Sequence, residues 1–227
     1  MRRTIVVLIL AIVVTSLVSR ASWPAEIAVR ISNITDRSFT ILWKTKTPQA
    51  GWIEYGQTKE LGSVAYDVRG KDTKDVLHYV TLKDLKASTP YYYRVMPSKT
   101  TTSPEIQTTG PEIGLPGFRT VYGQIVKSDG TTPVANAVAL AEILDANGAE
   151  DSGHSTLVSG VSDASGYWNM ELGCARVPDL TSYFRFSEEG DKMALAVESS
   201  AQGRSQLSLK LSDCAEMVTV TLKGRQK

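Results

Sequence analysis

Apolar residues in this chain recur at every second position, and this alternation constrains the fold more than any other feature of the sequence. The clearest example is the run LKASTPYYYRV, in which Tyr91, Tyr93 and Val95 alternate with Tyr92 and Arg94. A period of two is the pattern of a β-strand with one buried face, whereas helices repeat near every 3.6 residues. Beyond the N-terminus, no helical pattern extends for more than about one turn. We therefore predict an all-β fold.

The length of the chain predicts two modules. With 227 residues it exceeds one average domain and can bury two modest cores of roughly 100 residues each. Short strands at regular spacing are typical of β-sandwiches. Residues 104–117 are rich in proline and glycine, which is the composition of a connector. We therefore predict tandem β-sandwich modules over residues 24–109 and 118–227, joined by a linker over residues 110–117.

Alternating apolar positions locate the expected strands in each module. In the first module these positions are Ile27, Val29 and Ile31; Phe39, Ile41 and Trp43; Ile53 and Tyr55; Tyr79, Thr81, Leu82 and Leu85; and Tyr91, Tyr93 and Val95. In the second module they are Val121, Gly123 and Ile125; Pro133 to Leu140; Leu207, Leu209 and Leu211; and Val218, Val220 and Leu222. The segment Ser162 to Trp168 contains a turn favoured by Asp and Gly and is expected to join two further strands.

The N-terminus has the pattern of an export signal. Arg2 and Arg3 form a short positive region, and the run from Ile5 to Val18 is almost wholly apolar. Ser19-Arg20-Ala21 places small residues at positions −3 and −1 of a cleavage site. The 14-residue apolar run is shorter than the about 20 residues that span a membrane. We predict a signal peptide over residues 1–21, with an uncleaved signal-anchor helix as the alternative, and a secreted or cell-surface protein.

The charge balance argues against one class of partner. Of the 25 basic residues, Arg2, Arg3 and Arg20 lie in the first 21 positions, so residues 22–227 carry 22 basic and 24 acidic side chains, a net charge of −2. Proteins that bind nucleic acids usually carry a basic patch that attracts phosphates. We therefore expect no nucleic acid partner.

Cys174 and Cys214 are the only cysteines, and both lie in the second module. In an oxidising compartment an even number of cysteines within one module favours a disulfide. The bridge would close a loop of about 40 residues and stabilise the fold by roughly 3 to 4 kcal/mol in the chain-entropy model. Two buried free thiols are the alternative. A zinc site would need further ligands, and neither His78 nor His154 stands at ligand spacing from either cysteine.

Four segments of the first module together resemble a known domain family. SFTILWKT, WIEYG, HYVTLKDL and LKASTPYYYRV are similar to strands of a fibronectin type III domain, closest to the variant found ahead of purple acid phosphatases. The resemblance implies an immunoglobulin-like sandwich in which Trp43 is the core tryptophan and Leu85 lies beside a tyrosine corner. Tyr91 would be the corner tyrosine, whose hydroxyl bonds to main chain. All three would be packing residues.

The chain departs from this family in the turn before the corner. Ala87 and Ser88 replace the usual Pro-Gly. Pro90 would also deny one backbone donor to its strand, which an edge or bulged start tolerates.

The second module is similar to a carboxypeptidase regulatory-like domain, a transthyretin-like sandwich. The resemblance lies in VYGQI at Val121 to Ile125, in the run Pro133 to Leu140 and in Asp163 to Tyr167. The loop 145–154 is longer than the family pattern, and the two cysteines are not part of it. The resemblance implies a non-catalytic accessory module on secreted or envelope proteins, which sometimes binds protein or carbohydrate.

Outward-facing aromatic residues are the candidate binding residues. If Ile53 and the inward tyrosines of LKASTPYYYRV face the core, alternation places Trp52, Tyr92 and Arg94 on the outer face of the sheet. Trp52 and Tyr92 would then form an exposed pair that stacks on sugar rings or anchors a protein. The alternative is that they only stabilise the sheet or are covered by the second module. Trp168 is the corresponding candidate on the second module.

No catalytic or metal site is predicted. Metal-assisted phosphoester hydrolysis needs several His, Asp and Asn ligands, and the chain has only His78 and His154. No Gly-x-Ser-x-Gly motif accompanies either histidine, and His78 is expected on a strand surface or between modules. The acidic loop 145–151 lacks the spacing of an EF-hand calcium site and is interpreted as a solvated hairpin tip. Asn33-Ile34-Thr35 matches the glycosylation sequon.

Three functional classes remain open. The preferred one is a non-catalytic structural, adhesive or interaction scaffold without cofactors, which binds an extracellular or envelope protein or polysaccharide and contacts a membrane only through an uncleaved N-terminal segment. The second is a carbohydrate-binding accessory protein that uses exposed aromatic residues. The third is a small secreted hydrolase, which would need a cleft with two facing carboxylates.

Overall fold

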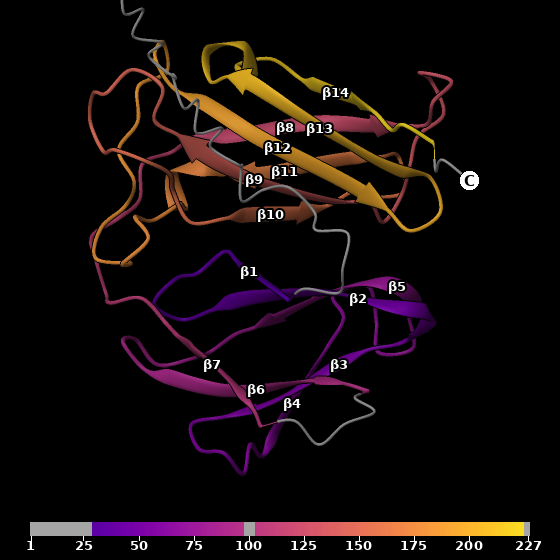
Figure 1. Ribbon diagram of the computed structural model, residues 1–227, viewed down its shortest axis with the longest axis vertical. Helices are drawn as coiled ribbons and strands as arrows, with labels where there is room; N and C mark the ends of the chain where they lie inside the picture. Colours follow the sequence, from indigo (N-terminus) through magenta and orange to yellow (C-terminus); the bar gives the residue numbers. More distant parts are fainter. Residues whose placement is uncertain (1–28, 98–102, 225–227) are drawn as a thin grey trace, which may run out of the picture.

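The computed structural model describes residues 29–97 and 103–224 and confirms the all-β fold of tandem sandwiches (Figure 1). The predicted signal segment, residues 1–21, and the strand position Ile27 lie outside the described residues. Within the described residues, no helix is long and apolar enough to cross a membrane.

The first module consists of two antiparallel sheets. One sheet has the order β1-β2-β5, with β1 at Arg30–Ser32, β2 at Phe39–Ala50 and β5 at Lys74–Leu82. The other has the order β4-β3-β6-β7, with β4 at Ser63–Tyr66, β3 at Trp52–Gly56, β6 at Pro90–Met96 and β7 at Glu105–Thr108. Strands β4 and β7 were not predicted from the alternation, and β7 lies inside the segment 104–117 whose composition indicates a connector. Both are edge strands of only four residues, so their patterns are too short to be distinctive.

The core of the first module contains the predicted packing residues. Trp43 is 2% exposed and Leu85 is 4% exposed. The Tyr91 hydroxyl accepts a hydrogen bond from the Lys86 backbone N–H at 3.0 Å, which is the expected corner contact. The turn before it is closed by Ser88, which takes a left-handed φ of 49° and donates its backbone N–H to Gly110. Pro90 is the first residue of β6, where a missing donor is tolerated.

The second module is also a pair of sheets. One has the order β10-β9-β12-β13, with β10 at Val158–Val161, β9 at Val138–Leu144, β12 at Lys192–Ser199 and β13 at Gly203–Lys210. The other has the order β11-β8-β14, with β11 at Tyr167–Glu171, β8 at Thr120–Val126 and β14 at Val218–Thr221. The turn predicted between two strands joins β10 to β11 and therefore passes from one sheet to the other. The Asp163 carboxylate closes it by accepting the backbone N–H groups of Ser165 and Tyr167.

The two modules pack face to face through one sheet from each (Figure 1). Leu42, Leu77 and Tyr79 on the outer face of β2 and β5 form a single buried cluster with residues of β9 and β12. The residues contributed by β9 and β12 are Val138, Leu140, Ala194 and Ala196. Strand β9 also sends Ala139, Ala141 and Ile143 into the core of its own module. The protein is therefore a four-layer stack of sheets in which β9 is buried on both faces, which explains its nearly unbroken apolar sequence.

Asn33 joins the two modules at one edge of this interface. Its side-chain amide nitrogen lies 3.0 Å from the Tyr79 hydroxyl and 3.1 Å from the Ser159 carbonyl, and its side-chain oxygen accepts the Ser159 N–H at 2.8 Å. Its backbone N–H donates to the Leu157 carbonyl. The same amide nitrogen would carry a glycan on the sequon Asn33-Ile34-Thr35, so glycosylation there is incompatible with this docked arrangement.

A second polar contact crosses the interface. Lys44 and Glu198 form an ion pair of 2.6 Å, and both side chains are less than one fifth exposed. Removal of either partner would leave a half-buried charge in the interface.

We predict that Asn33→Gly lowers the free energy of unfolding by about 2 to 4 kcal/mol, because it leaves several buried polar groups unpaired across the interface. Glycine accepts the left-handed φ of 50° at this position, so the loss reports the side chain and not backbone strain. Chemical denaturation monitored by tryptophan fluorescence measures the effect. The matched control is Asn169→Ala on the exposed side of β11, for which a change of more than about 0.5 kcal/mol is not expected. Equal effects at the two positions would contradict the role of Asn33.

The structure does not contain the disulfide predicted between Cys174 and Cys214. Both residues are free thiols. Each cysteine ends its own 3-10 turn, η1 at Leu172–Cys174 and η2 at Ser212–Cys214. The Cys214 sulfur is directed to the Lys210 carbonyl of the preceding strand, at 3.3 Å, and it packs in the module core. Burial raises the pKa of both thiols, which lowers the fraction of reactive thiolate.

We expect two alkylated cysteines per chain when the protein is unfolded without reductant and treated with iodoacetamide, as measured by intact mass. Labelling of the folded protein should be slower, because burial and a raised pKa both disfavour attack. If the mass of the unfolded protein shows no added label, the two cysteines form the disulfide and this prediction is wrong.

Candidate functional site

The outer face of the sheet β4-β3-β6-β7 carries the exposed aromatic residues of the first module. Strand register places Tyr66, Trp52 and Met96 in one cross-strand row and Val64, Glu54 and Arg94 in the next. A third row contains Tyr92 and Ile106. Tyr66 is 51% exposed, Val64 48% and Ile106 56%, whereas Trp52, Tyr92 and Met96 are partly exposed. We call this set of residues the outer sheet face.

The structure does not bring Trp52 and Tyr92 together. Trp52 is paired with Met96, and Tyr92 is paired with Gly56, so the two aromatic residues lie four positions apart along the strands. At about 3.3 Å per residue this separates them by roughly 13 Å. The Glu54 and Arg94 side chains lie between them. The predicted aromatic pair is therefore wrong as a pair, and the aromatic neighbour of Trp52 is Tyr66, on the strand that sequence reasoning missed.

Trp168 does not form the exposed platform proposed for the second module. It is 2% exposed and packs in the module core, where its indole lies against the backbone of Gly123. The exposed aromatic residues among the described part of this module are instead Phe118 at 98%, Tyr167 at 48% and Tyr122 at 45%. Tyr122 and Tyr167 occupy diagonal positions on β8 and β11, which places them within reach of each other.

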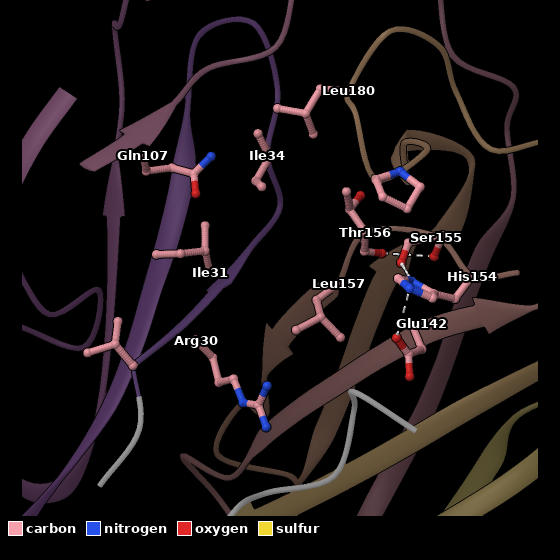
Figure 2. Close-up of a pocket in the computed structure, with 12 residues that line it drawn as sticks. Arg30, Ile31, Ile34, Gln107, Glu142, His154, Ser155, Thr156, Leu157 and Leu180 are labelled. Atoms are coloured by element: carbon pink, nitrogen blue, oxygen red, sulfur yellow. Dashed lines mark hydrogen bonds and ion pairs between the residues drawn. The ribbon is translucent and has the colours of Figure 1, made fainter. Parts of the chain in front are cut away.

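A cavity of about 330 Å³ lies between the modules (Figure 2). Arg30, Ile31 and Gln107 line it from the first module, whereas Glu142 and His154 line it from the second. The His154 Nδ1 donates to the Ser155 carbonyl at 2.9 Å and lies 3.9 Å from the Glu142 carboxylate. Glu142 is the one carboxylate among the described lining residues, so this cavity does not offer the carboxylate pair of a glycosidase.

Ser155 is not an activated nucleophile despite its place beside His154. Its hydroxyl donates to the Thr156 carbonyl at 2.8 Å and accepts the Ile143 backbone N–H at 2.9 Å. A nucleophilic serine would instead donate its proton to a base, as in the Ser-His-Asp triad. The serine therefore serves to anchor its loop to β9.

A buried ion cluster lies in the first module, around the connection from β4 to β5. Asp67 is 4% exposed and accepts hydrogen bonds from Arg69 at 2.8 Å and from the Tyr79 N–H at 2.9 Å. Arg69 also pairs with Asp75 at 2.8 Å and donates to the Leu77 carbonyl. Burial alone would raise the pKa of Asp67, but these hydrogen bonds outweigh it and lower the pKa. Each charge has a partner, so the cluster is structural.

His78 lies in the core of the first module and not, as predicted, on a strand surface or between modules. It is fully buried and stacks on Trp43 with ring centroids 4.7 Å apart. The physical reason is its position on β5, between Leu77 and Tyr79, which face the second module. Burial lowers the pKa of His78, and the Asp67 carboxylate, 4.0 Å from its Nδ1, opposes this effect only in part.

The described residues contain no group of three or more His, Cys, Asp or Glu side chains that would hold a metal ion. In the acidic loop, Asp145 accepts the backbone N–H groups of Asn147 and Gly148, and Asp151 pairs with Arg185 at 2.9 Å. These carboxylates accept hydrogen bonds from the loop and from Arg185, as expected for a solvated hairpin tip.

Comparison with known proteins supports the family resemblance predicted for the first module. A family model described as "Purple acid Phosphatase, N-terminal domain" matches residues 24–109. This match covers the first module and less than half of the chain, and it describes the N-terminal domain of that enzyme family. The carboxypeptidase regulatory-like resemblance of residues 118–227 stays a prediction. No curated protein matches the chain.

Two solved structures show distant likeness to the chain. The FN1-FN3 domains of chicken CNTN1 align with 13% identity over 86% of this chain and 66% of that chain, slightly under two thirds, at a TM-score of 0.25. A marsupial T cell receptor aligns with 10% identity over 82% of this chain and 96% of that chain, at a TM-score of 0.21. TM-scores of this size do not establish a shared fold, so the sandwich architecture rests on the strand topology described above.

We predict that the free energy of unfolding decreases as the pH falls from 7 to 5, and that His78→Phe removes part of this decrease. Unfolded His78 titrates near pH 6.5, whereas the folded side chain stays neutral to a lower pH. Below pH 6.5 the unfolded state therefore binds the extra proton, and stability is lost by up to about 1.4 kcal/mol per pH unit. Urea denaturation at several pH values measures the slope. The control His154→Gln should retain it, and an unchanged slope in His78→Phe would contradict the assignment.

Proposed function

We propose that this protein is a non-catalytic interaction scaffold, exported or held at the cell surface, which presents the outer sheet face to an extracellular or envelope partner. The observation that carries the proposal is the packing of the two modules. The interface between them uses one sheet face of each module, so the second module does not cover the outer sheet face of the first.

The composition of the outer sheet face supports a binding role. It combines Trp52, Tyr66, Tyr92, Arg94 and Met96, which are residue types enriched in the centres of protein interfaces. Val64, Tyr66 and Ile106 are about half exposed on the two edge strands, and Trp52, Tyr92 and Met96 are partly exposed on the strands between them. Exposed apolar surface that is contiguous in this way marks interaction sites. The same residues would provide an anchor for a partner.

The docking of the two modules supports a rigid scaffold rather than two binding modules joined by a flexible linker. The buried apolar cluster, the hydrogen bonds of Asn33 and the Lys44–Glu198 ion pair would all be lost if the modules separated. A partner bound to the first module would therefore be held at a defined position relative to the second.

A carbohydrate-binding accessory protein is the second candidate function. The observation that favours it is the cross-strand placement of Trp52 beside Tyr66, because aromatic side chains on a flat sheet stack on sugar rings. Arg94 and Glu54 in the neighbouring row would offer hydrogen bonds to hydroxyl groups. A small hydrolase has less support, since Ser155 donates its hydroxyl to main chain and the described lining of the cavity has a single carboxylate.

Co-sedimentation of the full chain with isolated envelopes and with purified polysaccharides tests both candidates. We expect the double variant Trp52→Ala, Tyr66→Ala to weaken binding roughly thirtyfold, which corresponds to the loss of about 2 kcal/mol from an interface anchor. The matched control Tyr122→Ala, Tyr167→Ala removes two exposed tyrosines from the other end of the stack and should bind normally.

The ligand that sediments the protein separates the two candidates. Retention on envelopes that the first variant loses supports the scaffold, and retention on a polysaccharide that it loses supports carbohydrate binding. Binding that neither variant affects contradicts the assigned surface, and no binding to any of these materials contradicts the proposal itself.

A further inference from the structure

We propose that the partner of the outer sheet face is a second copy of this chain, docked through a two-fold axis that runs along the strands between β3 and β6. This inference rests on the proposed binding role of that face and identifies its occupant. The residues on the face are arranged so that a copy related by this axis meets chemically matching groups.

The charged row is self-complementary. Glu54 on β3 and Arg94 on β6 are direct cross-strand neighbours, with their charged groups 3.6 Å apart. A two-fold axis midway between the two strands exchanges their positions, because a symmetric interface brings residue i onto residue j and j onto i. Each Glu54 would therefore face Arg94 of the other copy, and the interface would gain two cross-copy ion pairs.

Arg94 has hydrogen-bonding capacity that the described residues of its own chain do not use. Its contact with Glu54 is longer than a hydrogen bond, and its Nε is buried without a hydrogen-bond partner among the described residues. A guanidinium group prefers two parallel hydrogen bonds to one carboxylate. The Arg94 side chain is 27% exposed, so a Glu54 carboxylate of the second copy would approach the exposed part of this side chain from above the sheet.

The same two-fold axis also brings complementary side chains together in the row that contains Trp52. Trp52 and Met96 are direct neighbours on β3 and β6, so the axis places Trp52 of one copy over Met96 of the other. Methionine sulfur makes favourable contacts with aromatic rings. Tyr66 and Val64 on β4, together with Ile106 on β7, would form the apolar margins of the contact. Two sheets packed in this way give an aligned sandwich contact, a common mode of sheet packing.

The second module leaves this face available. The opposite sheet of the first module is covered by the second module through the buried cluster described above. Dimerisation through the outer sheet face would extend the stack of sheets in one direction, with the second modules at the two distant ends.

Charge reversal tests this geometry with the full chain carrying either of two affinity tags. We expect differently tagged wild-type copies to capture each other when they are co-expressed. E54R should fail to capture E54R, because the introduced guanidinium group would face Arg94 of the other copy. R94E should fail to capture R94E for the corresponding reason, since two carboxylates would then face each other. Each single variant should lose about tenfold or more of the captured partner.

Mixed capture is the decisive measurement. E54R presents two arginines and R94E presents two glutamates, so E54R should capture R94E at close to the wild-type level. A cross-strand role within one chain predicts no such rescue. Each variant's thermal unfolding is measured in parallel, so that failure to fold is recognised. R37E and E112R, at the exposed ion pair of 3.0 Å between Arg37 and Glu112, are the matched control and should leave capture unchanged.

The outcomes separate this inference from the proposed function. Absence of wild-type capture, or capture that is unaffected by both E54R and R94E, overturns the self-association. If the chain then still binds envelopes or a polysaccharide through Trp52 and Tyr66, the outer sheet face remains a binding site with a different occupant. Loss of capture in both single variants without rescue on mixing also overturns the two-fold geometry.

Discussion

The structure depends on the contact between the sheet β1-β2-β5 of the first module and the sheet β10-β9-β12-β13 of the second. This contact buries the face of β9 that does not pack in its own module, and it removes one broad face of each module from solvent. Apolar burial supplies its free energy, whereas Asn33 and Ser159 fix its register through directional hydrogen bonds. Because both kinds of interaction act at one interface, the modules behave as a single unit and not as two domains on a tether.

Much of this architecture follows from periodicity. Alternation correctly predicted most strands of the first module, the inward positions of Trp43 and Tyr91, and an all-β fold. Periodicity did not predict β4, β7 or β12. The first two are short edge strands, and β12 is apolar at every position from Met193 to Val197 because this stretch is buried on both sides. Burial by another module is a tertiary effect, so a pattern based on one buried face cannot locate such a strand.

The binding residues were harder to predict than the fold, since they depend on register. Alternation correctly places Trp52 and Tyr92 on one face, but only the pairing of β3 with β6 shows that they lie four positions apart. Trp168 is different, because a usable signal was present. Trp168 and Met170 are two positions apart and therefore lie on the same face of the strand, whereas Tyr167 lies on the other. Two large apolar residues on one face indicate that this face points inward. The cysteines were misjudged for a further reason, since an even count says nothing about where each sulfur points.

The outer sheet face differs from the other polar clusters of the molecule in how its polar groups are paired. The ion cluster of Asp67 and Arg69 is internally satisfied, and Ser155 hydrogen-bonds with main chain. Arg94 differs, because it is half-buried beside exposed apolar residues and retains a donor without an acceptor among the described residues. Stability alone does not explain this arrangement, since an unpaired buried donor costs free energy and exposed apolar surface gains none. A partner that brings a carboxylate and an apolar surface to the face would pair the exposed part of the Arg94 side chain and cover the apolar residues, and a second copy of the chain carries both groups on the same sheet.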